Sequence, residues 1–449
     1  MLKEINKMSS VIPSNIHLFR GDENRSTDEF IEQVAVFRNK VRQLIPHGKV
    51  ARVLLFESNI FSFLVRFIAL GQEGHTIVLP PNDQQGTIEE LAENVDFYAG
   101  SIVISHLVSL DESDTVIQCD EAFFWPTNGR VIFYTSGSSS RAKAIVKDWC
   151  LLNNEVDVLR GVFKCKPQST FISTVSHQHI YGLLFRALLP LKLGASIFNT
   201  FEYPEHIVDV MDKCCDAILI SSPAFLSRLS KDNVLSQFKE HFTYIFSSGG
   251  PLQDASALTL CQQFSTGIIQ VYGSTETGGI AYRQLIKKED VLWHFFPGVS
   301  CVSTDGDNRL QLFSPFIHQS SMILDDKGIV IDGKLKLLGR IDRTIKLEEK
   351  RVNLSQIELK CLEHSWVEEV RLIVLSGDRQ ILAAIVKLNA FGNEALKDAG
   401  KRRINQSIKE HLLTHFELVT LPRKWRYVDE LPYNSQGKLP VMELEKLFD

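Results

Sequence analysis

Residues 130–146 read RVIFYTSGSSSRAKAIV, an apolar run that passes directly into a loop of hydroxyl residues and glycine ending at Lys143. The apolar part has the composition of a buried β-strand. In a loop of this kind, backbone N–H groups and hydroxyls can surround a polyphosphate, and the lysine adds a compact positive charge. The Walker A pattern GxxxxGK[ST] is absent, and a Ser/Gly-rich loop alone is as typical of a flexible turn as of a phosphate site.

Apolar runs of the same kind recur on both sides of this stretch. They lie at 52–56, 75–80, 101–105, 170–176, 217–223, 243–250 and 268–274. Helical patterns separate many of them, for example at 87–97 and after Ser26, where Ser26 and Glu29 have capping-box spacing. Continuous apolar strands that alternate with helices predict a layered α/β fold with buried, largely parallel sheets. Several runs end in small polar residues, where a nucleotide could bind if the strands are adjacent.

The bulk composition is that of an ordinary enzyme. The 449 residues suggest two or three domains, and 44% hydrophobic with 23% charged residues is typical of a globular protein. A net charge of -5 gives no electrostatic footprint for nucleic acid, so no nucleic-acid partner is expected. The N-terminus lacks the apolar core of a signal peptide, and the apolar stretch 54–70 is interrupted by Glu57 and Arg66. We therefore expect a cytoplasmic protein without a membrane span.

The character of the chain changes near Gly339. A strongly charged segment at 339–358 reads as a connector. Two strand patterns and one helical pattern follow it, at 369–376, 380–389 and 392–417. The pattern predicts a large α/β domain over residues 1–340 and a small α+β domain over residues 341–449.

Three further motifs accompany the Ser/Gly loop in a fixed order. Residues 271–279 read VYGSTETGG, where an aromatic ring can cover a purine, a glycine allows close approach of the backbone and Glu276 can hold Mg²⁺. Residues 339–346 read GRIDRTIK and residues 431–438 read LPYNSQGK. Each motif alone has an ordinary structural explanation as a polar turn. Their common order and spacing carry the argument.

Together the four motifs resemble those of the adenylate-forming (AMP-binding) superfamily, which includes acyl-CoA synthetases, adenylation domains of nonribosomal peptide synthetases and firefly luciferase. The resemblance runs from about residue 50 to the end. It implies a large layered N-terminal domain and a small mobile α+β C-terminal domain. It also implies an acid–thiol ligase, which uses ATP and Mg²⁺ to make acyl-AMP with release of pyrophosphate. The acyl group then passes to CoA or to the phosphopantetheine of an acyl carrier protein.

The resemblance assigns ATP binding to residues of the first three motifs and of the strand ends between them. They are Thr135, Ser136, Gly137, Ser138, Ser139, Lys143, Gly249, Tyr272, Gly273, Ser274, Thr275, Asp325 and Arg340. Ser140 and Ala142 stand where glycine and proline are usual. The family's TGD motif is absent, and counting back from Arg340 at the usual spacing places its aspartate at Asp325, with Asp326 as the competing candidate.

The same resemblance assigns the remaining roles. Lys438 looks like the catalytic lysine that bridges the carboxylate and the α-phosphate, and Asp342 resembles the hinge of the small domain. His179 is a second catalytic candidate that, with Tyr181 and Gly250, matches segments bordering the acyl pocket. Little covalent work falls to such an enzyme, because it must bring two anions together and neutralise the developing charge. Tyr181 and the aromatic run at 294–296 hint at an aromatic or medium-chain acid, although core packing explains them equally well.

The acceptor and two rival functions stay open. Glu349 stands where glycine is usual at the entrance of the thiol arm, which favours a carrier protein over free CoA. One rival is a stand-alone adenylation protein for amino acids, but the segment SHQHIYG at 176–182 offers no aspartate for an α-amine. The other is a degenerate nucleotide-binding protein without catalysis, suggested by the missing TGD and opposed by the retained Lys438 and Glu276.

Overall fold

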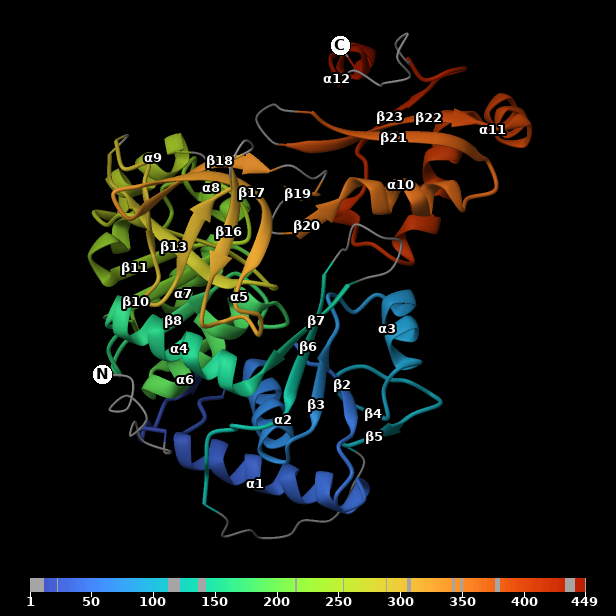
Figure 1. Ribbon diagram of the computed structural model, residues 1–449. Helices are drawn as coiled ribbons and strands as arrows, with labels where there is room; N and C mark the ends of the chain where they lie inside the picture. The colour runs from blue at the N-terminus through green and yellow to red at the C-terminus, as the bar shows by residue number, and fades with distance from the viewer. Residues whose placement is uncertain are drawn as a thin grey trace. The chain divides into compact units, whose positions relative to one another are not determined.

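The computed structural model describes most of the chain: residues 12–21, 23–111, 122–135, 143–214, 216–252, 254–287, 289–304, 308–340, 344–347, 350–375, 380–432 and 441–448. These residues form two compact units (Figure 1). The first comprises the described parts of Met1–Pro81, Leu91–Tyr134 and Ala144–Ile341. The second comprises those of Asn82–Glu90, Thr135–Lys143 and Asp342–Asp449.

One sheet has six strands among the described residues. Their order is β5 (Val108–Ser109), β4 (Phe97–Gly100), β2 (Arg52–Phe56), β3 (Thr76–Leu79), β6 (Arg130–Thr135) and β7 (Lys143–Asp148). Neighbouring strands from β5 to β6 pair in parallel. Helix α2 (Ile60–Gln72) packs on β2, β3 and β4, and α1 (Thr27–Leu44) packs on α2 (Figure 1). The capping box predicted at Ser26 and Glu29 begins α1 and is confirmed.

The strand predicted at 101–105 is wrong. Strand β2 pairs with β3 on one side and with β4 on the other, and β4 ends at Gly100. Gly100 has φ +99°, and a side chain there would collide with the carbonyl oxygen of Phe56, so the chain turns out of the sheet at this glycine. Val103 is consequently 85% exposed. Helix α3 (Gln85–Ala92) is also shorter than the predicted 87–97, because Phe97 already belongs to β4.

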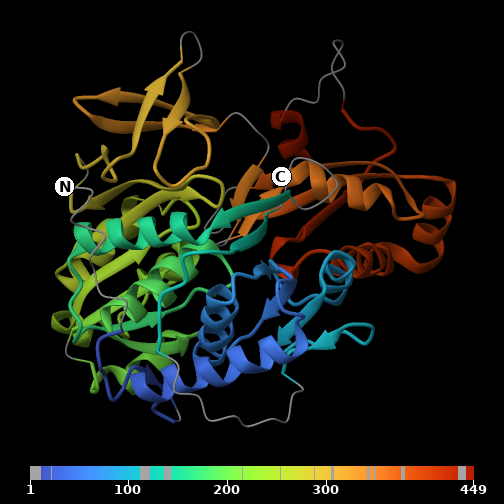
Figure 2. The same cartoon turned by 60° about the horizontal axis from the view of Figure 1, so that its bottom comes forward.

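The second sheet of the first unit has twelve strands in the described chain. Their order is β1 (Phe19–Arg20), β9 (Ser196–Thr200), β8 (Thr170–Ser173), β10 (Ala217–Ser221), β11 (Phe242–Ser247), β12 (Ile268–Ser274), β13 (Gly278–Leu285), β14 (Trp293–Phe295), β18 (Lys334–Arg340), β17 (Met322–Ile331), β16 (Arg309–Phe313) and β15 (Ser300–Ser303). Strands from β1 to β12 pair in parallel. Those from β12 to β15 pair antiparallel. Figure 2 shows β15–β18 in yellow and orange at the upper left.

The expectation of largely parallel sheets therefore holds for only part of this sheet. Its antiparallel part needs no crossover helices, so short hairpins connect its strands, such as the turn at Asp332 and Gly333, both with positive φ. The helices of the unit other than α1 and α2 follow β7 in the chain. They are α4 (Trp149–Phe163), α5 (Ile180–Gly182), α6 (Leu189–Leu193), α7 (Pro204–Met211), α8 (Pro223–Leu229), α9 (Asp254–Phe264), the π-helix η2 (Leu183–Leu188) and the 3₁₀-helix η3 (Ser236–His241). The layered arrangement confirms the predicted α/β class.

The second unit is an α+β structure. It holds a hairpin of β19 (Thr344–Leu347) and β20 (Lys350–Asn353) and a sheet of β21 (Val367–Leu375), β22 (Ile381–Leu388) and β23 (Lys424–Tyr427). Its helices are α10 (Leu354–Leu362), α11 (Ala390–Leu413), α12 (Val441–Glu445) and the 3₁₀ turns η4 (Leu418–Thr420) and η5 (Lys446–Phe448). Two strands and a helix predicted from sequence correspond to β21, β22 and α11. Buried apolar residues from these elements form their own core, which includes Leu382, Ile404 and Trp425.

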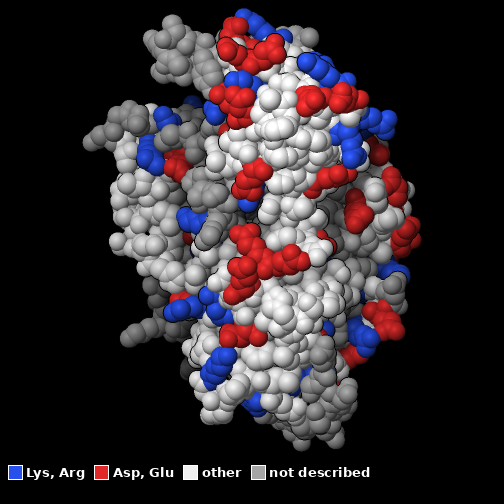
Figure 3. Space-filling model, turned by 90° about the vertical axis from the view of Figure 1, so that its right-hand side faces the viewer, with Lys and Arg blue, Asp and Glu red and all other residues white. Residues whose placement is uncertain are grey.

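Two surface properties of the described residues bear on partners. No helix among them is both long and apolar enough to cross a bilayer, and the apolar stretch 54–70 is divided between β2 and α2. Figure 3 shows one face of the molecule, on which acidic and basic side chains are interspersed.

Candidate functional site

A tight turn at residues 274–279 joins β12 to β13 and carries Glu276. Hydrogen bonds inside the turn link Ser274 and Thr277: the Ser274 N–H donates to Thr277 Oγ1 at 3.0 Å, and the Thr277 hydroxyl donates to the Gly278 carbonyl at 2.8 Å. Gly278 has φ +68°, a conformation that favours glycine. Gly273 faces the Gly278 carbonyl so closely that a side chain at 273 would collide with it. The sequence GSTETGG therefore folds as a compact turn because its glycines allow this approach.

Lys147 holds this turn from outside the hairpin. It lies on β7 and is only 2% exposed. Its Nζ donates to the carbonyl oxygen of Glu276 at 3.0 Å and to that of Phe316 at 2.7 Å. A charged donor makes these bonds stronger than those between neutral groups. Burial lowers the pKa of Lys147, while the nearby carboxylates of Glu155 and Glu276 act in the opposite direction.

Glu155 holds the far end of the same turn. It lies on α4, is 3% exposed, and its Oε1 accepts the backbone N–H of Gly279 at 2.6 Å. A Cβ atom at Gly278 would lie 2.6 Å from Glu155 Oε2, so the carboxylate packs directly against the turn. Burial raises the pKa of Glu155, and Lys147 and the Gly279 N–H favour its charged form. The two buried groups compensate one another electrostatically.

The donor set at the turn suits one kind of metal ion. Among the described residues, no group of three or more His, Cys, Asp or Glu side chains is placed to hold a metal ion. Glu276 therefore supplies a single, half-buried carboxylate beside the hydroxyls of Ser274 and Thr275. Mg²⁺ is commonly bound by one or two carboxylates together with substrate phosphates. The turn fits a magnesium ion that arrives with a nucleotide.

The second glycine-rich strand end lies beside this turn. Strands β11 and β12 are parallel neighbours, so SSGG at 247–250 and the start of the turn lie at the same edge of the sheet. Gly249 has φ +88°, Gly250 is half-buried, and the Ser248 hydroxyl donates to the Val271 carbonyl at 2.9 Å. The Tyr272 ring is half-buried, with its centroid 6.0 Å from that of Trp293.

The Ser/Gly loop follows a strand of the other sheet. Strand β6, which precedes it, belongs to the six-stranded sheet, so the condition that the strands be neighbours is met by β11 and β12 but not by β6. Thr135 ends β6 and Lys143 begins β7 with an exposed side chain. Ser136, Gly137, Ser138 and Ser139 lie outside the described residues, as do Asp342, Glu349 and Lys438.

Two of the predicted acyl-pocket residues, His179 and Tyr181, lie around the start of the π-helix η2. His179 precedes α5, and the Tyr181 hydroxyl donates to the Ser221 carbonyl at 3.2 Å while its ring packs on Phe185. π-Helical turns frequently occur at functional sites. In the aromatic run at 294–296, by contrast, Phe296 is buried in the core, where it packs on Tyr282.

His177 is a buried structural residue. Its Nε2 lies 2.6 Å from the Glu57 carbonyl, and its Nδ1 contacts Nη1 of the fully buried Arg186. A carbonyl only accepts and a guanidinium only donates, so Nε2 carries the proton and Nδ1 accepts. Burial and the Arg186 charge hold the pKa of His177 well below its ordinary value, and burial lowers the pKa of Arg186 to about 9.

The two aspartates on β17 have different surroundings. Asp325 accepts from Arg309 Nη2 at 2.7 Å, and both side chains are near half exposure. Asp326 lies opposite Arg340 in the register of β17 and β18. Both candidates therefore lie on the same antiparallel ribbon, and Arg340 ends its second strand.

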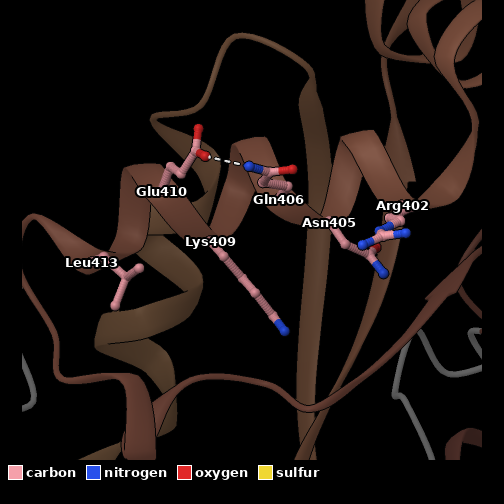
Figure 4. A pocket seen from close by; sticks show the side chains of 6 residues that line it. All are labelled: Arg402, Asn405, Gln406, Lys409, Glu410 and Leu413. Atoms are coloured by element: carbon pink, nitrogen blue, oxygen red, sulfur yellow. Dashed lines mark hydrogen bonds between the residues drawn. The ribbon is translucent and has the colours of Figure 1, made fainter.

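A surface hollow of the second unit lies apart from these residues in the sequence. It is lined entirely from α11 by Arg402, Asn405, Gln406, Lys409, Glu410 and Leu413 (Figure 4). Lys409 points into it, and Gln406 Nε2 donates to Glu410 Oε1 at 2.8 Å. No predicted site residue lines it.

The sequence analysis missed Lys147 and Glu155. A signal for Lys147 was available: in KAIVKD it shares its strand face with the apolar Ile145, so it points inward. Glu155 likewise lies four residues before Leu159, on the buried face of α4. Neither local pattern indicates that Lys147 and Glu155 meet at the 274–279 turn, because this contact joins segments that are far apart in the sequence.

Comparisons with known proteins show what this chain is similar to. The family model described as "AMP-binding enzyme" matches residues 81–294. The chain is 23% identical over 317 residues to 3,4-dihydroxybenzoate–[aryl-carrier protein] ligase of Bacillus anthracis, covering 70% of this chain and 72% of the relative. It is 24% identical over 323 residues to 4-coumarate–CoA ligase of Halorhodospira halophila, covering 68% and 74%.

Solved structures resemble the whole chain. Amide bond synthetase McbA from Marinactinospora thermotolerans superposes with a TM-score of 0.83 at 14% identity, covering 99% of both chains. A mutant of o-succinylbenzoate CoA synthetase from Bacillus subtilis superposes with a TM-score of 0.79 at 14% identity, covering 99% of this chain and 98% of the other.

Proposed function

This chain is an AMP-forming acid–thiol ligase of the adenylate-forming superfamily, and on that premise we propose which of its residues perform the two half-reactions. In the first, a carboxylate oxygen attacks the α-phosphorus of ATP, the bond from that phosphorus to the bridging oxygen breaks, and pyrophosphate leaves. In the second, a thiolate attacks the acyl carbonyl carbon, and AMP leaves with the electron pair of the acyl C–O bond.

The geometry of the 274–279 turn is the observation that carries the assignment of the nucleotide site. Its single carboxylate, Glu276, sits on a backbone held by Lys147 and Glu155 beside the glycine-rich end of β11. Glu276 would hold Mg²⁺ together with the phosphates, and the ion would neutralise phosphate charge. Tyr272 would lie against the adenine, and Ser274 and Thr275 would donate to phosphate oxygens.

Two lysines supply the remaining positive charge. Lys143 closes the predicted phosphate loop at residues 135–143, and Lys438 belongs to the C-terminal domain predicted at 341–449. Joining a carboxylate to a polyphosphate brings two anions together, so a fixed cation at each lowers the barrier more than any covalent participation. Asp342 would be the hinge about which the C-terminal domain brings Lys438 to the carboxylate.

We propose an aromatic acid as the substrate and a carrier protein as the acceptor. Two relatives carry names that state aromatic acids, 3,4-dihydroxybenzoate with an aryl-carrier protein and 4-coumarate with CoA. Tyr181 and Phe185 offer aromatic surface beside His179. Glu349 replaces the usual glycine at the entrance of the thiol arm, and a carboxylate there repels the phosphates of free CoA.

The test is acid-dependent pyrophosphate release across a panel of aromatic, fatty and amino acids, each with no acceptor, with CoA, and with holo carrier protein. Release with aromatic acids and a thioester on the carrier protein are expected. Release only with amino acids would assign the enzyme to amino-acid adenylation instead, and silence with ATP still bound would make it a non-catalytic nucleotide-binding protein. The variant Lys438→Ala should keep ATP binding and lose pyrophosphate release by a factor on the order of 100.

A further inference from the structure

Two buried charges meet the 274–279 turn from elements that lie next to one another in the sequence. Lys147 is near the end of β7, four residues after Lys143, and Glu155 is in the second turn of α4, the helix that follows β7 directly. Both are at least 97% buried. A buried charge normally needs a compensating charge or a set of hydrogen bonds. Here each charge is compensated by the other and by the backbone of the turn.

Their contacts fall on two backbone groups of the turn, one at Glu276 and one at its far end. Lys147 binds the carbonyl of Glu276 itself, and Glu155 binds the N–H of Gly279, three residues later. The bonds between Ser274 and Thr277 lie within the turn and move with it. The two charged contacts tie the turn to β7 and α4, outside the hairpin. They restrict the backbone from which the Glu276 carboxylate projects.

Lys147 also joins this turn to the segment that leads into β17. Its second hydrogen bond goes to the carbonyl of Phe316, whose side chain is 1% exposed. An ammonium group has three N–H donors, and two of those of Lys147 form hydrogen bonds with carbonyl groups of separate loops. A side chain without a donor, such as methionine, would leave both carbonyls without these hydrogen bonds.

We propose that Lys147 and Glu155 are positioning residues that hold the backbone of the 274–279 turn so that Glu276 meets a magnesium–nucleotide complex in the correct place. The proposal rests on the assignment of Glu276 to magnesium under the proposed function. It goes beyond that assignment, because both residues act through the backbone of the turn and neither belongs to the four sequence motifs.

The experiment compares four variants with wild type: Lys147→Met, Glu155→Gln, the double variant and Lys192→Met. The last is the matched control, since Lys192 is another largely buried lysine whose Nζ donates at 2.8 Å to Asp157, two residues after Glu155 on α4. Binding of a non-hydrolysable ATP analogue is measured by calorimetry over a Mg²⁺ series and again with EDTA, in both cases without acid. Thermal unfolding is recorded for every variant.

In the wild type, Mg²⁺ should tighten binding of the analogue. Residues that orient a metal ligand typically alter metal affinity by 10–100-fold, so Lys147→Met should raise the half-saturating Mg²⁺ concentration about tenfold. Affinity without metal should fall by a smaller factor than the Mg²⁺ requirement rises, because Ser274 and Thr275 move with the turn, whereas Gly249 and the predicted phosphate loop at 135–143 do not belong to it. Glu155→Gln should give a smaller shift in the same direction, and the double variant less than the product of the two. Lys192→Met should leave the Mg²⁺ dependence unchanged.

A folded Lys147→Met variant with wild-type Mg²⁺ dependence would overturn the proposal, and so would an equal shift in Lys192→Met. If Lys147→Met does not fold, Glu155→Gln decides, because it keeps the size and the acceptor for Gly279. A Glu276→Gln variant distinguishes failure of the magnesium role of Glu276 from failure of the positioning role of Lys147 and Glu155. If Glu276→Gln binds the analogue with the Mg²⁺ dependence of the wild type, the magnesium role of Glu276 fails. If the Mg²⁺ dependence changes in Glu276→Gln but not in Lys147→Met, the magnesium role stands and the positioning role alone fails.

Discussion

The 274–279 turn and the ribbon of β17 and β18 belong to the same sheet, yet different forces hold them. The turn is fixed by Lys147 and Glu155, both buried, through hydrogen bonds to its backbone. On the ribbon, Asp325 pairs with Arg309, and the two side chains are 46% and 41% exposed. Water screens an exposed ion pair, so breaking it to form another interaction costs little free energy. Breaking the interactions of a buried charge costs much more. The turn is therefore preorganised, whereas Asp325, the proposed ribose ligand, would have to exchange Arg309 for the ribose hydroxyls.

The largest expected effect comes from Glu276→Gln, which leaves the turn in place and removes its carboxylate charge. We expect kcat/KM for acid-dependent pyrophosphate release to fall by a factor on the order of 100, as for loss of one preorganised electrostatic contact. Binding of an ATP analogue in EDTA should stay within about twofold, because the metal is then absent. A variant with normal turnover would remove Glu276 from the reaction.

The next largest effect is a difference in the free energy of unfolding between two glycine variants, one in the 274–279 turn and one in the β17–β18 ribbon. Gly278→Ala places a methyl group against Glu155 at φ +68°, whereas Gly333→Ala, at φ +72° in the β17–β18 hairpin, meets nothing within 4 Å. Positive φ alone costs about 1–2 kcal/mol, so both variants should lose unfolding free energy. Gly278→Ala should lose about 2 kcal/mol more than Gly333→Ala in chemical denaturation, as expected for overpacking. Equal losses would mean that Glu155 yields easily and that the turn is not rigid.

A smaller effect is expected at the ribbon. Loss of a charged acceptor for ribose hydroxyls costs about 1.5–3 kcal/mol, so Asp325→Asn should raise KM for ATP at least about tenfold. Asp326→Asn should raise it less than about threefold by the same reasoning if Asp325 is the ribose ligand. Initial rates over an ATP series measure both, and the reverse order would transfer the role to Asp326.

The smallest effect is expected for Arg309→Gln. The pair with Asp325 is near half exposure, so the free energy of unfolding should change by at most about 1 kcal/mol. KM for ATP should stay within about twofold if Asp325 exchanges partners as described. Urea unfolding and initial rates test the two statements, and a large rise in KM would make Arg309 a necessary support of Asp325.

Local patterns predicted the elements whose cause is local. The capping box at Ser26, the apolar strands β2, β11 and β12 and the helix α11 follow from residues close together in the chain. The adjacency of the strand ends near Gly249 and Tyr272 also follows, since sequential parallel strands commonly pair. The assignment of Glu276 came from its motif and stays a prediction of function.

The remaining features depend on contacts that a local pattern does not contain. Gly100 ends β4 because the Phe56 carbonyl is in the way, and Phe56 belongs to another strand. The antiparallel part of the twelve-stranded sheet depends on the pairing of β14 with β18, and no pattern within either strand indicates its partner. The strand pattern indicates that Lys147 points inward, but its partners, the carbonyls of Glu276 and Phe316, lie more than 120 residues away in the sequence.

The closeness of Lys147 and Glu155 in the chain has a consequence for building hybrid enzymes. Because β7 and α4 are consecutive, one short segment spanning 143–163 carries both charges and can be transplanted between relatives as a neutral unit. An exchange boundary placed between positions 147 and 155 would instead leave one recipient with an uncompensated buried ammonium and the other with an uncompensated buried carboxylate. Chimeras joined before β7 or after α4 should therefore express and fold where those joined at the start of α4 fail.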